Sequence, residues 1–234
     1  MKKITISTYL LLLNFFLLNS QSKINEKNSY LLFDEALGLN NTELYNGIIY
    51  RNNLKKTSIN TRFYNSENFQ LANIKYNNNW FYNIETKYDL YSQKVIVKLS
   101  YLNEGHIVIE LFSNSIEEFN INNKKFIRTK DFTFWEIVLE NNNLNIYRKH
   151  KKNKKETIVD NKLYDNFKTV GPNLIVSYKN KLHEVKKEKD ILKIFGNDKF
   201  LKKIFKENKS IKKTNKQDFY IECIKNINDL LLNK

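Results

Sequence analysis

Three runs of aromatic and β-branched residues, separated by short polar turns, occupy the middle of the sequence. Residues 69–101 read FQLANIKY, NNN, WFYNIETKYDLY, SQ and KVIVKLSY in order. Runs of this kind, bounded by Asn, Ser and Gln, are typical of antiparallel strands joined by tight turns. A chain with this centre must bury at least one face of a sheet. We therefore take a β-meander as the element around which the fold is organised.

The register of the first hairpin follows from residue parity. If the second strand is continuous, Trp80 and the large residues at alternate positions after it face one way. Tyr76 meets that face only across a loop with an odd number of residues. We therefore predict that Tyr76 lies opposite Trp80 across a three-residue loop, 77–79, whose Asn residues tolerate left-handed backbone. The residues expected on the shared face are Trp80, Tyr82, Ile84, Tyr88 and Leu90.

Asn-rich turns between apolar runs recur along the rest of the chain. Residues 133–140 (TFWEIVLE) are apolar at both parities, which indicates a strand buried on both faces. A short helix is expected at residues 30–39, with Leu31, Leu32, Ala36 and Leu39 on its buried face. Further strands are expected at residues 44–50 (or a hairpin at Asn46-Gly47), 106–112, 118–121, 126–129, 144–148, 173–178 and 181–185.

From residue 188 the spacing of apolar residues changes from two to about 3.6, the period of a helix. Helices are expected at 190–195, 198–207 and 216–232, with residues 208–215 as a polar break. Gly196 is suited to end the first helix, and Thr214 or Asn215 to cap the last.

These patterns predict an α+β fold. Residues 21–187 are expected to form an antiparallel β-meander, either a curved sheet or barrel-like. Residues 188–234 are expected to add two or three helices packed on it.

Residues 1–20 (MKKITISTYLLLLNFFLLNS) have the organisation of a secretory signal peptide. Two lysines precede an apolar core at 9–18, and small or polar residues follow at 19–22. A membrane anchor needs about 20 consecutive apolar residues, and this run is shorter. We expect cleavage close to Ser20, export to the periplasm or the medium, and no membrane span in the mature chain. The single cysteine, Cys223, is expected to be a buried free thiol in the last helix.

The formal net charge of +15 favours anionic partners, but its origin is open to two interpretations. The excess is almost all Lys, which with Asn, Ile, Phe and Tyr follows from AT-rich codons. Export argues against nucleic acid, so the partners considered are an anionic envelope surface or another envelope protein. In the alternative, the lysines only form solvated faces. The candidate contact residues are Lys149, Lys151, Lys152, Lys154 and Lys155 in one run and Lys199, Lys202, Lys203 and Lys206 in a basic amphipathic helix.

The sequence contains no motif for catalysis, metal binding or nucleotide binding. His106, His150 and His183 lack metal-ligand spacing, and we expect no cofactor. Glu85 and Asp89 share a strand face but lie roughly 13 Å apart, too far for a glycosidase pair. We expect both carboxylates to face solvent and pair with lysines such as Lys87 and Lys98.

Several segments are similar to an uncharacterised family of exported proteins common in the Bacteroidota. They read NTELYNGIIY (41–50), IKYNNNWFYNIETKYDLYSQKVIV (74–97), FWEIVLENNNLNIYRKHKK (134–152) and KLHEVKKEKDILKIF (181–195), followed by the last helix. The resemblance covers most of the mature chain and implies export and a β-rich domain with a helical C-terminus. It implies no established activity and supplies no site residues.

Two functions are compatible with these observations. The first is a non-enzymatic exported protein of the cell envelope with a binding or structural role. The second is a hydrolase of envelope polymers with an unrecognised site. A cleft holding two carboxylates, or His with Asp, would favour the hydrolase. An apolar cavity lined by Trp80, Tyr82, Tyr88 and Trp135 would indicate a small hydrophobic ligand.

Overall fold

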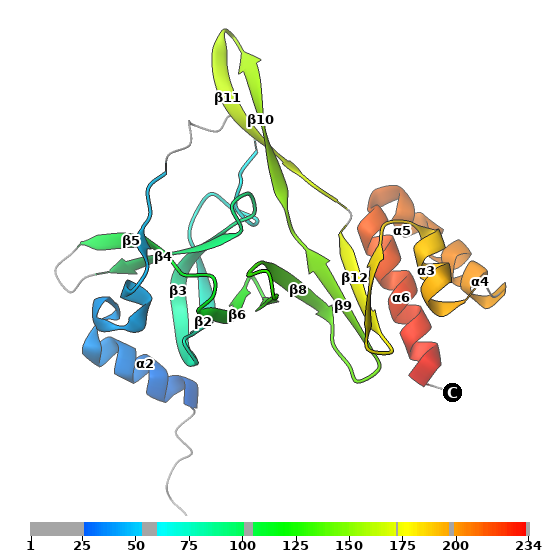
Figure 1. Cartoon of the computed structure of the whole chain (residues 1–234), viewed down its shortest axis with the longest axis horizontal. Helices are drawn as coiled ribbons and strands as arrows, with labels where there is room; N and C mark the ends of the chain where they lie inside the picture. Colours follow the sequence, from blue (N-terminus) through cyan, green and yellow to red (C-terminus); the bar gives the residue numbers. More distant parts are fainter. Residues whose placement is uncertain (1–25, 53–59, 101–104, 172, 197–198, 233–234) are drawn as a thin grey trace, which may run out of the picture.

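A computed structural model describes residues 26–52, 60–100, 105–171, 173–196 and 199–232. Its body is an eleven-stranded antiparallel sheet in the order β1-β5-β4-β3-β2-β6-β7-β8-β9-β12-β13. A separate hairpin, β10–β11, rises from the middle of the molecule, and helices α3 to α6 lie at the C-terminal end of the sheet (Figure 1). The predicted antiparallel meander with C-terminal helices is confirmed, and the sheet is open rather than closed into a barrel.

Among the described residues, the strands lie between residues 48 and 185. They are β1 (Ile48–Ile49), β2 (Gln70–Tyr76), β3 (Asn79–Asp89), β4 (Lys94–Ser100), β5 (His106–Glu110), β6 (Ile116–Ile121), β7 (Lys124–Arg128), β8 (Phe134–Leu139), β9 (Leu144–Lys149), β10 (Lys152–Val159), β11 (Lys162–Thr169), β12 (Leu174–Tyr178) and β13 (Lys181–Val185). The helices are α2 (Glu26–Leu37), η1 (Leu39–Asn41), η2 (Glu43–Tyr45), α3 (Glu188–Phe195), α4 (Lys199–Glu207), α5 (Lys209–Thr214) and α6 (Lys216–Leu232).

The register predicted for the β2–β3 hairpin is wrong. Tyr76 pairs with Asn79, and Lys75 pairs with Trp80. Asn77 and Asn78 alone form the turn, with φ angles of 49° and 67°. Two successive left-handed residues make the hairpin turn whose twist matches that of the strands. Because Asn accepts this conformation at both positions, two residues suffice and Asn79 joins the strand.

A β-bulge in β3 changes which side chains of that strand face the core. The β2–β3 register shifts in mid-strand, and Asn83 at this point has a φ of 57°. The extra residue reverses parity. Phe81 is therefore buried, whereas Trp80 and Tyr82 stack on the other face with ring centroids 5.7 Å apart. The predicted single face is thus broken at Asn83 and holds only after it.

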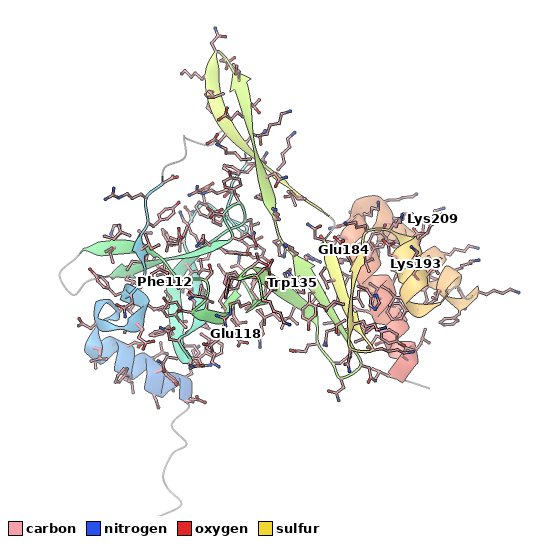
Figure 2. All side chains as sticks on the ribbon, in the orientation of Figure 1. Phe112, Glu118, Trp135, Glu184, Lys193 and Lys209 are labelled. Atoms are coloured by element: carbon pink, nitrogen blue, oxygen red, sulfur yellow. The ribbon has the colours of Figure 1, made fainter. Side chains whose placement is uncertain are left out.

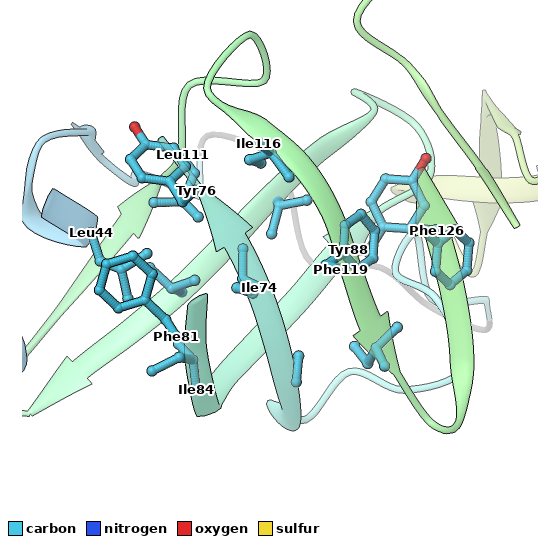
Figure 3. Packing of buried hydrophobic residues seen from close by; sticks show 14 of the residues in the cluster. Leu44, Ile74, Tyr76, Phe81, Ile84, Tyr88, Leu111, Ile116, Phe119 and Phe126 are labelled. Atoms are coloured by element: carbon cyan, nitrogen blue, oxygen red, sulfur yellow. The ribbon is translucent and has the colours of Figure 1, made fainter. Parts of the chain in front are cut away.

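The sheet has two apolar cores. In the first, side chains of strands β2 to β8 pack together with Leu44; Phe119 and Phe126 stack at 4.8 Å, and Tyr88 meets Phe119 edge-on at 5.3 Å (Figure 3). In the second, α3, α4 and α6 cover the part of the sheet formed by β9, β12 and β13, with Phe219 and Ile224 almost fully buried. The C-terminal helices therefore stabilise one end of the sheet.

Three local predictions for the C-terminal helices are confirmed. Gly196 follows α3 with a φ of 105°. The side-chain oxygen of Asn215 accepts hydrogen bonds from the backbone N–H groups of Gln217 (2.9 Å) and Asp218 (3.3 Å), so it caps α6. Cys223 is a buried free thiol on the same helix.

Other local predictions are wrong. Residues 209–214, expected as a polar break, form α5. In α2 the side chain of Leu32 is 64% exposed, and Asp34 is buried instead. In β8 the second buried residue is Glu136 rather than an apolar one. Residues 44–50 contribute only the two-residue strand β1 after a 3-10 turn.

The prediction of a signal peptide and the prediction about membrane spans concern different parts of the chain. Residues 1–20, predicted as a signal peptide, lie outside the described residues. Within the described ranges, no helix combines the length and the apolar content needed to cross a bilayer.

Candidate functional site

The first lysine run, residues 149–155, lies where two strands of different sheets follow each other. It spans the end of β9 and the start of β10. Lys152 donates a hydrogen bond to the backbone oxygen of Thr61, and Lys154 Nζ lies 3.3 Å from the carboxylate of Asp165, which is buried. Burial lowers the pKa of Lys152, although Glu67 and Asp89 oppose that shift. Lys152 and Lys154 are therefore structural.

The remaining lysines of this run are dispersed. Lys151 and Lys155 are exposed, and Lys149 is half-buried at the end of β9. Because neighbouring strand residues point to opposite faces, the run presents no continuous basic surface.

Helix α4, in contrast, gathers its lysines on one side. Leu201 and Ile204 are buried against the second core, with exposed fractions of 5% and 3%. The opposite side of the helix is the lysine face of α4, which consists of Lys199, Lys202, Lys203 and Lys206, all exposed. Lys203 Nζ lies 3.7 Å from Glu207 across one turn. The predicted amphipathic helix is present, with its apolar side on the protein.

More lysines surround this helix than the sequence predicted as contact residues. Lys209 and Lys213 lie exposed on α5, and Lys193 lies exposed on α3. Figure 2 shows the labelled Lys193 and Lys209 on the helical end of the molecule. Because residues 208–215 were expected as a polar break, their lysines were not among the candidate contact residues. The lysine-rich composition of this segment could have indicated them. The β10–β11 hairpin stands apart from α4 in Figure 1, so the two lysine groups form separate surfaces.

The buried carboxylate of Glu136 on β8 is surrounded by basic side chains, and this cluster links β8 to the end of β9. Glu136, 2% exposed, has its Oε2 atom 2.6 Å from His150 Nε2 and 3.9 Å from Arg148 Nε. Lys124 Nζ lies 3.6 Å from the other carboxylate oxygen. Burial alone would raise the pKa of Glu136, but the hydrogen bond with His150 and the charge of Arg148 outweigh it, so this pKa lies below its ordinary value.

This cluster has structural roles that its contacts explain. Arg148 Nη2 also lies 3.0 Å from Asp218 Oδ1, which ties β9 to α6. The imidazole of His150 lies against the rings of Tyr64 and Phe126, with centroids 5.1 Å and 5.7 Å away. No pattern in the sequence indicates this cluster, because Glu136 lies within an apolar run.

The carboxylates of β3 also form no pair with each other. Glu85 lies 3.0 Å from Lys98, as expected. The prediction for Asp89 is wrong: its side chain is buried, and its Oδ2 atom lies 3.2 Å from Arg62 Nε. Its Oδ1 atom accepts hydrogen bonds from the backbone of Tyr91 (2.8 Å) and Ser92 (3.1 Å). Asp89 thus fixes the β3–β4 turn, and Arg62 supplies the charge that offsets its burial.

The cavities were expected to discriminate between the two functions. In the part of the chain that the structure describes, four surface cavities were compared, and none of them is lined by a histidine or by two carboxylates. Within the same described residues, no three His, Cys, Asp or Glu side chains are placed to hold a metal ion. The bulge places Trp80 and Tyr82 on the face opposite Tyr88, so these three side chains do not line one cavity together.

Comparisons with known proteins do not assign a function to these residues. A scan against models of protein families finds no match, and neither do searches of curated protein sequences and of solved structures. The resemblance to exported Bacteroidota proteins therefore stays a prediction.

Proposed function

We propose that this is an exported, non-enzymatic protein of the cell envelope that acts by binding, and that its lysine face on α4 contacts an anionic envelope surface. The observation that carries the proposal is the arrangement of α4. Four exposed lysines share one side of a helix whose apolar side is fastened to the second core. A basic face held in this way adds attraction of about 1 kcal/mol per lysine near an anionic membrane.

Two further observations support the proposal. The pattern of residues 1–20 supports export, since a positive start, an apolar core and small residues occur in that order. Phe200, at the edge of the lysine face, is 43% exposed and offers an apolar contact beside the charges. Basic residues flanking an exposed aromatic ring are typical of helices that lie on membrane surfaces.

Co-sedimentation with vesicles tests the contact. The purified protein is expected to sediment with phosphatidylglycerol vesicles at low salt, to be released as salt increases, and to ignore phosphatidylcholine vesicles. The variant with Lys199, Lys202, Lys203 and Lys206 all changed to Gln is expected to lose most of this binding. A matched control changes the exposed lysines Lys151, Lys155, Lys162 and Lys168 to Gln. No sedimentation at low salt, or equal loss in both variants, would contradict a contact through α4.

Hydrolysis of an envelope polymer is the second candidate, and the 2.6 Å contact between His150 and Glu136 is the observation that favours it. A carboxylate that orients a histidine is part of many hydrolytic sites. Incubation with purified envelope polymers tests it: release of soluble fragments by the protein, abolished in His150→Ala, would establish the hydrolase. Absence of release across polymer classes would leave the binding function.

A further inference from the structure

Two cavities adjoin at the C-terminal end of the sheet, and Tyr178 and Leu231 line both of them. The first cavity, about 360 Å³, is apolar and lies among β12, α3, α4 and α6. The second, about 400 Å³, lies at the β8–β9 and β12–β13 turns and is polar. Each is within the size range of small-molecule sites. We call the two together the C-terminal groove.

The two parts of the groove differ in chemistry. Besides the shared pair, the apolar part is lined only by hydrocarbon side chains: Phe195, Phe200, Leu201, Ile227 and Leu230. The polar part is lined by four Asn residues, Ser177 and Lys179. Among the described residues that line either part, Lys179 is the sole charged one. The groove therefore suits a molecule with an apolar chain at one end and a polar or negative group at the other.

Tyr178 marks the boundary between the two parts. Its ring centroid lies 5.0 Å from that of Phe195 on the apolar side. The Nζ atom of Lys179 lies 5.3 Å from the same ring. A tyrosine with one apolar and one polar neighbour is typical of places where an apolar environment meets a wet one. A bound amphiphile could lie along this ring with its chain beside Phe195 and its head beside Lys179.

Apolar side chains remain accessible around this groove. Phe200 is 43% exposed, and Phe195, Leu230 and Leu231 are only half-buried. A ligand that covers this apolar surface gains free energy because it removes the surface from water. The positive charge at the polar end decides the type of head group, because an anion is attracted to Lys179 and a cation is repelled.

From this geometry we infer that the C-terminal groove binds a single-chain anionic amphiphile, such as a fatty acid or an alkyl phosphate. The alkyl chain occupies the apolar part, and the carboxylate or phosphate lies beside Lys179 and the Asn side chains. The inference is separate from the proposed membrane contact, since no lysine of the α4 face lines the groove and Phe200 alone borders both. A protein could have either property without the other.

Calorimetric titration of the purified full chain with laurate, below its micelle concentration, tests the inference. Laurate is expected to bind saturably at one site, and dodecyltrimethylammonium, with a cationic head, roughly tenfold more weakly. Lys179→Asn removes the charge and suits the left-handed backbone at this position, where φ is 51°. It is expected to weaken laurate binding roughly tenfold. Lys181→Asn, at an exposed lysine outside the groove, is the control and is expected to bind normally.

A second variant places a negative charge at the apolar part. Phe200→Asp is expected to reduce laurate binding at least roughly tenfold, through lost contact and repulsion. Phe33→Asp is its control, because Phe33 is 61% exposed on α2, outside the groove. Melting curves of all variants show whether each is folded. The α4 variant with four Gln residues is expected to keep laurate binding even if vesicle binding is lost.

Three results would overturn the inference. The first is the absence of saturable laurate binding. The second is equal binding of laurate and dodecyltrimethylammonium. The third is laurate binding that neither Lys179→Asn nor Phe200→Asp changes, since the amphiphile would then occupy a surface other than the groove.

Discussion

The Nε2 atom of His150 lies 2.6 Å from the Oε2 atom of the buried Glu136, and the two residues belong to neighbouring segments of the sheet. The contact holds a carboxylate where burial alone would favour its protonation. Because the pKa of Glu136 is lower in the folded chain than its ordinary value, the ionised form stabilises the fold. This contribution is present above the ordinary pKa and is lost as pH falls through the lowered one.

The first prediction follows from this pH dependence. Glu136→Gln is expected to lower the free energy of unfolding by about 2 kcal/mol at neutral pH, because charged hydrogen bonds and ion pairs are lost. It is also expected to flatten the decline of stability in the acid range. Urea denaturation at a series of pH values measures both effects. Glu184→Gln, at a side chain 49% exposed, is the control and is expected to change stability little. An unchanged acid slope in Glu136→Gln would contradict the assignment.

The second prediction concerns the β2–β3 turn. Asn78 has a φ of 67°, so Asn78→Val is expected to cost more than 1 kcal/mol, since β-branched residues avoid this conformation. Asn79 lies in β3, so Asn79→Val is expected to be neutral or stabilising. Thermal unfolding of the two variants compares them directly. A greater loss for Asn79→Val would restore the three-residue loop that parity predicted.

The third prediction concerns Cys223. Burial raises the pKa of its thiol to about 12, so it is almost entirely protonated at neutral pH. We expect negligible reaction with a thiol reagent in the folded protein and rapid reaction in denaturant, because the thiolate is the reactive form. Absorbance of the released chromophore follows the reaction. Rapid labelling without denaturant would show that α6 leaves the sheet readily.

The fourth prediction concerns export. Expression of the full chain in a bacterium with a Sec pathway is expected to yield a protein that starts near Gln21 and is recovered outside the cytoplasm. N-terminal sequencing and cell fractionation measure the two properties. The double variant Leu12→Asp with Phe15→Asp interrupts the apolar core. It is expected to stay uncleaved in the cytoplasm. Efficient export of that variant would contradict the signal-peptide assignment.

Local backbone preferences explain which parts of the fold the sequence could predict. Alternation of apolar residues marked most strands, and the helical period marked α3, α4 and α6. Gly196 and Asn215 were predicted correctly because the left-handed C-terminal residue and the N-cap depend on single residue types. The lysine face of α4 follows from the same periodicity.

The hairpin β10–β11 escaped prediction because its sequence lacks alternation. Residues 152–159 read KNKKETIV, and most of their side chains are exposed. What holds the base of the hairpin is tertiary: the ring of Phe167 lies 5.4 Å from that of Tyr91, and Lys152 donates a hydrogen bond to the backbone oxygen of Thr61. Contacts between segments far apart in sequence have no local signature.

By itself, the amino-acid sequence predicted most strands of the sheet, the helices α3, α4 and α6, and the helix that carries lysines on one side. Only the tertiary structure decided that β12 inserts between β9 and β13, that Asn83 makes a bulge, and that Glu136 is buried with His150. It also decided that Tyr178 and Lys179 line a groove together with side chains of α4 and α6. The physical reason is range: backbone preference acts within a few residues, whereas strand order, buried charge and cavities depend on which distant surfaces pack together.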